Sequence, residues 1–159
     1  RSNMRRSRIT EAMPKDRTIP KTAQKREAGF WKQFRTALTN RAKQKTLNWT
    51  RLETWAMPGV PDVVLQDHKG RFHFVELKAT GSNAVDLRPH QVSWLTKHGH
   101  GSVWILVKQE TSKMPKPKLY LFGGKDAVDL KMEGLTAVES YAELESPFDW
   151  EEIIDLILL

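Results

Sequence analysis

Asp62, Glu76 and Lys78 lie on two neighbouring apolar segments of the chain, 60–66 and 71–79. Both segments are predicted to be β-strands, joined by a three-residue hairpin loop whose last position, a glycine, suits the left-handed conformation found there. In the register that this loop sets, Asp62 lies directly opposite Glu76, with Cβ atoms roughly 5 Å apart. Lys78 follows Glu76 by two residues, so its side chain emerges on the same face.

Two facing carboxylates repel each other, and the apolar residues around them predict a buried position. Burying an uncompensated pair of this kind is costly. A hard divalent cation held by oxygen ligands, such as Mg²⁺ with Mn²⁺ as a substitute, is the natural compensation. Beside such an ion, Lys78 offers a charge for a phosphate, or a proton donor or acceptor for water. This combination is typical of metal-assisted phosphodiester hydrolysis.

The alternative interpretation of these three residues is a salt-bridge cluster on a solvated face of the sheet. Most Asp, Glu and Lys residues in proteins are exposed, which favours that interpretation by number alone. The apolar flanks of both segments and the hairpin register favour the metal site, because strands that are apolar on both faces are typical of the centre of a sheet.

The elements that position these residues follow from hydrophobic periodicity and turn signals. Helices are predicted over 21–38, over 89–98 and from Asp149, as a capping residue, to Leu159; strands are predicted over 47–55, 60–66, 71–79, 102–109 and 118–122. The order α-β-β-β-α-β-β-α predicts an α/β fold, in which a mixed central β-sheet is flanked by helices.

The composition excludes several classes of site. The 159 residues include no cysteine, so disulfides, thiolate zinc sites, iron–sulfur clusters and cysteine nucleophiles are absent. His98 and His100 lack the i,i+4 spacing of a helical zinc pair. No stretch reaches the roughly 18 apolar residues that a membrane span needs, and no organic cofactor is predicted.

The formal net charge of +7 is distributed unevenly along the chain. Residues 1–51 hold 15 Lys or Arg against 3 Asp or Glu, whereas residues 132–159 hold 8 acidic residues and no Lys or Arg. A basic first third favours a polyanionic partner such as the DNA backbone, because neutralising phosphates releases counterions. Residues 1–20 are predicted to be a flexible basic arm, with a solubilising tail as the alternative. Residues 21–159 are predicted to form one domain with an acidic, helical C-terminal extension.

The segments around the carboxylates resemble the signature of the PD-(D/E)XK nuclease superfamily. Gly59-Val60-Pro61-Asp62 is followed by a hairpin, by Glu76-Leu77-Lys78 and, on a short helix, by Gln91. This order is similar to that of the virus-type replication–repair nucleases, a branch that includes phage enzymes and is akin to Holliday junction resolvases. The resemblance covers about residues 24–109. It implies a restriction-endonuclease-like core and, for a phage-encoded protein, an intracellular location in the bacterial cytoplasm.

The resemblance also implies roles for further residues. The backbone carbonyl of Leu77 would join Asp62 and Glu76 as a metal ligand, and Gln91 would support the site. An acidic residue on the first helix is also expected. Glu27 is the candidate because it is predicted to share the stripe of core-facing aromatic residues, and Glu53 is held in reserve. The alternatives are a Glu27 paired with a lysine at the edge of the stripe and a Gln91 that is an ordinary exposed residue.

These features predict a Mg²⁺-dependent deoxyribonuclease. It would be an endonuclease selective for branched or Holliday-junction DNA in replication, repair or recombination, with DNA rather than RNA as the expected substrate. One alternative is a restriction-like nuclease specific for a duplex sequence, which the short chain disfavours because it leaves little surface for base readout. The other is a non-catalytic nucleic-acid-binding protein that uses the basic first third and does not depend on metal.

The last predicted helix carries more apolar residues than one stripe requires. The stripe consists of Trp150, Ile153, Ile154, Ile157 and Leu158, and Leu156 and Leu159 lie outside it. A partner subunit would cover the second surface, so a homodimer is predicted. Such a dimer would hold two sites in fixed relation, as cutting two strands of a junction requires. The alternative is that the helix closes the core of a single copy.

Overall fold

The computed structural model describes residues 21–52 and 57–159. Its centre is a six-stranded sheet in which the strands lie side by side in chain order. The strands are β1 (Asn48–Arg51), β2 (Val63–Gln66), β3 (Phe72–Thr80), β4 (Val103–Gln109), β5 (Lys118–Gly123) and β6 (Ala142–Glu145). Only β3 and β4 are parallel, and every other neighbouring pair is antiparallel, so the sheet is mixed.

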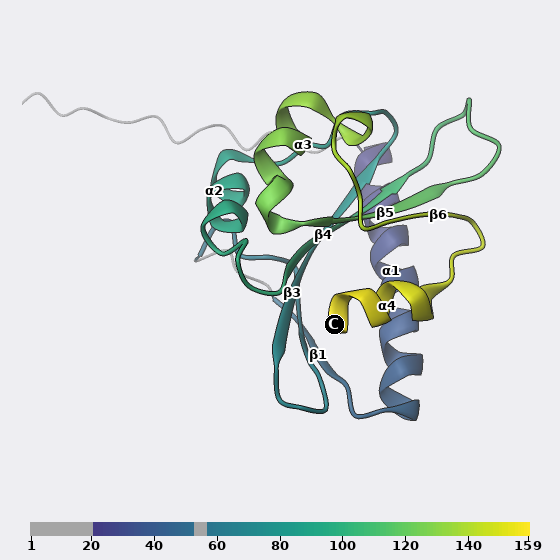
Figure 1. Ribbon diagram of the computed structural model, residues 1–159. Helices are drawn as coiled ribbons and strands as arrows, with labels where there is room; N and C mark the ends of the chain where they lie inside the picture. The colour runs from purple at the N-terminus through teal and green to yellow at the C-terminus, as the bar shows by residue number, and fades with distance from the viewer. Residues whose placement is uncertain (1–20, 53–56) are drawn as a thin grey trace, which may run out of the picture.

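Helices cover both faces of this sheet. They are α1 (Lys21–Gln44), α2 (Pro89–Lys97), α3 (Ala127–Glu133) and α4 (Trp150–Leu158), with short 3₁₀ turns η1 (Gly124–Asp126) and η2 (Leu135–Ala137). The parallel pair β3 and β4 needs a crossover connection, and α2 supplies it. Figure 1 shows α1 and α4 on one side of the sheet and α2 and α3 on the other. The predicted α/β fold with a mixed central sheet is confirmed.

Two apolar clusters, one on each face, form the core. The larger cluster packs α1 and α4 against the sheet through residues such as Phe34, Val75 and Ile154. The second packs α2 and α3 against the sheet through residues such as Leu95, Ile105 and Leu130. Alternate residues of each strand therefore point to different clusters. Along β3, Val75 faces α1 and α4, whereas Phe74 faces α2 and α3.

The prediction of individual elements was incomplete beyond β5. The α3 helix and β6 were not predicted, because α3 is one short run of seven residues and β6 is a four-residue edge strand with a Glu at every second position. The first helix is also longer than predicted and ends at Gln44. The predicted arm 1–20 and the end of the predicted strand 47–55 lie outside the described residues, as does the reserve candidate Glu53.

The hairpin between β2 and β3 has the predicted register. Val63 pairs with Val75 and Gln66 with Phe72, so the loop closes as the sequence indicated. Gly70 has φ +79°, the left-handed conformation for which a glycine was expected, and its N–H donates to the carbonyl of Asp67. The turn therefore fixes which residues of the two strands face each other.

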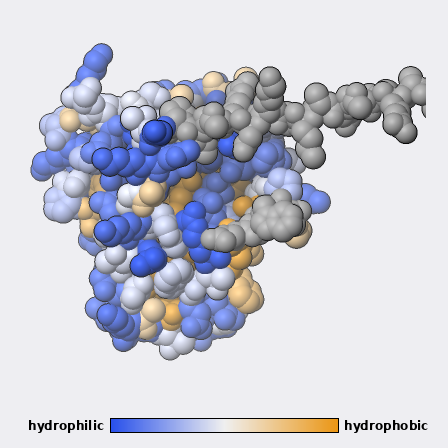
Figure 2. All heavy atoms as spheres, turned by 180° about the vertical axis from the view of Figure 1, so that it is seen from behind, coloured by the Kyte–Doolittle hydropathy of each residue, from blue (hydrophilic) through white to orange (hydrophobic). Residues whose placement is uncertain are grey.

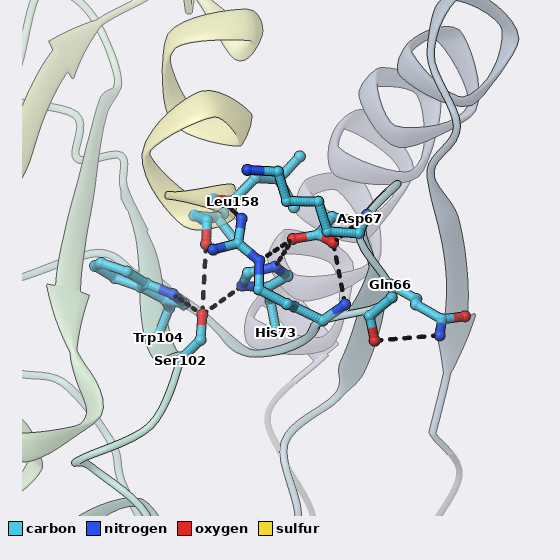
Figure 3. A network of polar contacts seen from close by, with 10 residues as sticks. Gln66, Asp67, His73, Ser102, Trp104 and Leu158 are labelled. Carbon is cyan, nitrogen blue, oxygen red and sulfur yellow. Dashed lines mark hydrogen bonds and ion pairs between the residues drawn. The ribbon is translucent and has the colours of Figure 1, made fainter.

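A polar network fastens the hairpin loop to α4 (Figure 3). Asp67 accepts hydrogen bonds from the His73 ring at 2.8 Å and from the Arg71 side chain at 2.8 Å, and His73 contacts the Ser102 hydroxyl at 2.5 Å. Burial acts to raise the pKa of Asp67, but the hydrogen bonds from His73 and from the loop backbone outweigh it, so this pKa lies well below its ordinary value. Arg71 also donates to the Leu158 carbonyl at the end of α4. The network thereby joins three segments that are distant in sequence.

The α4 helix packs on its own chain. Asp149 caps it as predicted, accepting from the Glu152 N–H at 3.2 Å. Its three isoleucines, Ile153, Ile154 and Ile157, are fully buried in the larger cluster. Of the two leucines outside the predicted stripe, Leu156 packs against that cluster and Leu159 is exposed, so only part of the apolar excess from which a partner subunit was predicted is covered within the chain. None of the described helices is long and apolar enough to cross a membrane.

Hydrophilic residues cover most of the face shown in Figure 2, and hydrophobic residues are exposed between them in separate areas. Within the part of the chain that the structure describes, the large hydrophobic side chains that are more than half exposed are Met57, Phe72, Met132, Tyr141 and Leu159. Phe72 is the one of these that belongs to a strand. The prediction that both faces of the hairpin are buried is therefore wrong at this end of β3.

Candidate active site

Asp62 and Glu76 come together at the end of the hairpin opposite its loop. Asp62 directly precedes β2, and the pairing of Val63 with Val75 continues to place it opposite Glu76. Its backbone carbonyl accepts from the Leu52 N–H at 2.7 Å, and its side-chain Oδ2 accepts from the Leu77 N–H at 2.9 Å. These two hydrogen bonds fix the Asp62 carboxylate against β3.

Pro61 explains why β2 does not pair with β3 beyond Val63. In the same register Pro61 lies opposite Leu77, and proline has no N–H to donate to a neighbouring strand. The N–H and carbonyl of one strand residue point to the same edge, so the Leu77 carbonyl is directed to the side on which its N–H meets Asp62. Because of Pro61, the Leu77 carbonyl receives no backbone hydrogen bond from the strand that contains β2. Asp62, the next residue, places its carboxylate beside that carbonyl.

Gln91 links α2 to both charged residues of β3. Its Nε2 donates to Glu76 Oε1 at 3.0 Å, and its Oε1 accepts from Lys78 Nζ at 3.0 Å and from the Arg88 backbone N–H at 3.0 Å. Lys78 Nζ also lies 3.8 Å from Glu76 Oε1. The first turn of α2 therefore orients both the carboxylate and the ammonium.

Glu76 is buried in a way that calls for a cation. Its relative exposure is 1%, and its second oxygen, Oε2, is buried without a hydrogen-bond partner. Burial, followed by the negative charge of Asp62, raises the pKa of Glu76 to about 9, and the Lys78 ammonium opposes this shift without cancelling it. An unpaired carboxylate oxygen in the core is costly unless a ligand satisfies it.

The oxygen atoms gathered here suit a hard divalent cation. Asp62, Glu76 and the Leu77 carbonyl could hold one, since Mg²⁺ prefers oxygen ligands and keeps several waters. Within residues 21–52 and 57–159, no group of three or more His, Cys, Asp or Glu side chains is placed to hold a metal. A metal at this position would therefore rest on two side chains and a backbone carbonyl rather than on a closed cage.

Gly59 positions the Asp62 segment against α2, a role that its place in the sequence motif did not reveal. It has φ +95°, and a Cβ at this position would overlap the backbone carbonyl oxygen of His90. The chain before Asp62 therefore lies in direct backbone contact with the first turn of α2, one residue from Gln91. A side chain at position 59 would push the two halves of the site apart.

Gly59→Ala is expected to destabilise the fold by about 2–4 kcal/mol and to lower the activity of the site about 10²-fold, because strain and displacement add. Gly70→Ala is the matched control, since Gly70 also has a positive φ but its Cβ would meet nothing closer than 4.0 Å. That control is expected to lose only about 1–2 kcal/mol, the cost of the left-handed conformation, with unchanged activity. Denaturant unfolding and the reaction rate of the site measured on both variants check this. Equal losses of activity in the two would contradict the proposed contact.

Glu27 does not lie where the sequence placed it. It is exposed, whereas the buried stripe of α1 runs through Phe30 and Phe34 and continues toward the N-terminus through half-buried Arg26. Arg26 packs over Gly81, just beyond β3, so in the first turns of α1 Arg26 rather than Glu27 lies on the side of the buried stripe. The predicted position of Glu27 in that stripe is wrong, and its part in the site stays a prediction.

No family model matches the chain, and no curated protein matches it. Among solved structures, the chain is similar to the Holliday junction resolvase Hjc from the archaeal hyperthermophile Archaeoglobus fulgidus. The sequence identity is 14%, the TM-score is 0.39, and the match covers 73% of this chain and 88% of that chain. A TM-score of this size does not establish a shared fold, so the class of protein rests on the geometry around Asp62, Glu76 and Lys78.

Proposed function

We propose that the protein is a divalent-metal-dependent nuclease of the PD-(D/E)XK type that hydrolyses DNA phosphodiester bonds. The observation that carries the proposal is the buried, unpaired oxygen of Glu76, which lies opposite Asp62 and beside an ordered lysine. Two facing carboxylates with an adjacent ammonium form a poor structural element but a suitable metal and phosphate site. The sequence resemblance to PD-(D/E)XK nucleases, which implies a restriction-endonuclease-like core, agrees with this function.

The residues of the chain have separate tasks in the proposed reaction. Asp62 and Glu76, with the Leu77 carbonyl, hold Mg²⁺ or Mn²⁺, which when bound polarises a phosphate oxygen and eases the deprotonation of water. Lys78 Nζ has three N–H donors and gives one of them to Gln91, so it has donors left for a phosphate oxygen or an attacking water. Gln91 keeps that ammonium in place, and the basic first third of the chain contributes contacts to the DNA backbone.

We expect the protein to cleave a branched substrate in the presence of Mg²⁺ and to cleave no substrate in excess chelator. The test uses labelled linear duplex, single-stranded, flapped and four-way-junction DNA, with an RNA strand of the same sequence as a comparison. Faster cutting of flapped or junction DNA than of linear duplex supports structure selectivity. Cutting at one duplex sequence favours the restriction-like alternative, and metal-independent binding without any cleavage favours the non-catalytic alternative.

A homodimer stays part of the proposal as the arrangement that would cut two junction strands together. Because α4 covers most of its apolar surface within its own chain, the pairing surface is not assigned to that helix. Light scattering at micromolar concentration decides between one copy and two.

A further inference from the structure

Within residues 21–52 and 57–159, the β1–β2 end of one sheet face stays partly exposed beside the candidate site. On the side of α2 and α3, the cross-strand rows Thr50–Val64–Phe74 and Asn48–Gln66–Phe72 run over β1, β2 and the start of β3. In these rows Asn48, Thr50 and Phe72 are exposed, and the other three are half-buried. Asp62 and Glu76 form the next row of the same face. We call the six residues of the first two rows, without Asp62 and Glu76, the open face.

The open face carries aromatic rings at its exposed end. Phe72 is 58% exposed, although it belongs to a central strand. The ring centroids of Phe74 and of Trp94 on α2 are 5.5 Å apart, and the Trp94 ring lies tilted against that of His98, with centroids 4.2 Å apart. Phe72 and Glu76 are four residues apart on one strand, or about 13 Å. An exposed ring, Phe72, and a half-buried pair, Phe74 and Trp94, in line with a site of phosphate chemistry are the elements of a stacking platform.

The charges around the open face favour a polyanion. Asp and Glu are absent from residues 46–52, 63–66 and 87–109, and from the hairpin residues 68–75. The same segments supply Lys69, Lys97 and the histidines of the loop after α2, whereas Arg71 is bound to Asp67 and to the Leu158 carbonyl on the other side of the sheet. Asp67, the remaining carboxylate of the hairpin, is buried and hydrogen-bonded on the other side of the sheet. Among the described residues of β1, β2, the hairpin loop and α2, no exposed Asp or Glu side chain therefore lies on this face, and Asp62 and Glu76 border it.

We propose that the open face binds an unpaired strand of nucleic acid, with bases stacked on Phe72 and on the Phe74–Trp94 pair, and leads its backbone to Asp62 and Glu76. This inference rests on the proposed nuclease function and adds a substrate class to it: DNA with a single-stranded segment next to the bond that is cut. Open sheet faces bearing aromatic residues bind single strands in other folds by the same physics. Stacking tolerates any base sequence, because every base offers a π-face.

Phe72→Ala tests the proposal, since an exposed ring can be removed without opening the core. Binding of a fluorescein-labelled oligothymidylate of about 12 nucleotides is measured by anisotropy in excess chelator, so that no cleavage interferes. Affinity is expected to fall about 5- to 150-fold, the loss of one base–aromatic stack. Phe72→Tyr keeps the stacking surface and is expected to bind within about threefold of the wild type. Tyr141→Ala removes a ring that is 51% exposed elsewhere and is expected to change nothing.

The outcomes separate this inference from the proposed function. Wild-type affinity for the oligonucleotide in Phe72→Ala overturns the inference, whether or not the protein cleaves DNA. Reduced affinity in that variant, with no substrate cut by the wild type, supports a strand-binding face and contradicts the nuclease. A change from dimer to monomer in Phe72→Ala, with strand affinity unchanged, overturns the inference by assigning the face to a second copy of the chain.

Discussion

Replacing Glu76 by Gln is expected to lower the rate of DNA cleavage by at least about 10³-fold and to leave the fold intact. The amide has nearly the shape of the carboxyl group and keeps an acceptor for Gln91, but it is a far weaker metal ligand. The pKa of Glu76 is about 9, so the metal-free protein already holds this group mostly protonated at pH 7. The thermal midpoint without metal is therefore expected to change by no more than a few degrees, about 1 kcal/mol or less.

Metal-dependent stabilisation distinguishes lost metal binding from other causes of inactivity. Because Mg²⁺ would bind the folded state and not the unfolded chain, it is expected to raise the thermal midpoint of the wild type. Glu76→Gln is expected to show no such rise. Glu143→Gln, on the edge strand β6, serves as the matched control and is expected to keep both cleavage and stabilisation. Asp62→Asn is expected to resemble Glu76→Gln, because its amide oxygen can still accept from the Leu77 N–H. If Glu76→Gln cleaves at the wild-type rate, the metal assignment is wrong.

Lys78→Met is expected to lower the cleavage rate about 10²- to 10⁴-fold while Mg²⁺ binding persists. The ammonium is 3.8 Å from Glu76 and is held by Gln91, so its loss removes charge from the phosphate or water without removing a metal ligand. Single-turnover rates report the chemical step, and calorimetry reports metal affinity. Lost metal affinity in this variant would reassign Lys78 to the assembly of the metal site.

The chain offers a close control for this lysine. Lys108 on the adjacent strand β4 is as buried as Lys78, with 12% and 13% of the side chain exposed, but it contacts Gln33 of α1 instead of the site. Lys108→Met removes the same charge and methylene packing from the neighbouring strand. It is expected to cleave at close to the wild-type rate, so equal losses in the two variants would point to net charge rather than to the position of Lys78.

The hairpin was predictable from sequence because local rules determine it. One glycine in a three-residue loop fixes the register, and the register alone brings Asp62 opposite Glu76. Lys78 then follows from the alternation of side chains along a strand. The contacts of Gln91 were only suggested by resemblance, since they depend on how the first turn of α2 approaches β3 through the backbone contact of Gly59.

What the sequence could not predict depends on packing between distant segments. Glu27 is exposed while its neighbour Arg26 packs over Gly81, a contact between residues more than 50 positions apart. The exposure of Phe72 depends on where α2 stops covering the sheet, and an apolar strand sequence does not record that limit. From the sequence alone, the isoleucines of α4 could equally pack into the core of their own chain or against a partner subunit. The packing of the larger cluster decides between the two.

The packing of α1 against α4 makes the completion of the core depend on the synthesis of the last helix. Arg41 of α1 is paired with Glu151 and Asp155 of α4, and the three isoleucines of α4 complete the cluster that contains Phe34. The partners of these ion pairs are separated by 110 and 114 residues, so the cluster closes a very long loop of chain. As the ribosome extends the chain, the part of the apolar side of α1 that packs on α4 stays uncovered until α4 has been made. A nascent chain stalled before Trp150 would therefore expose this surface to chaperones, because the larger cluster would still lack the isoleucines of α4.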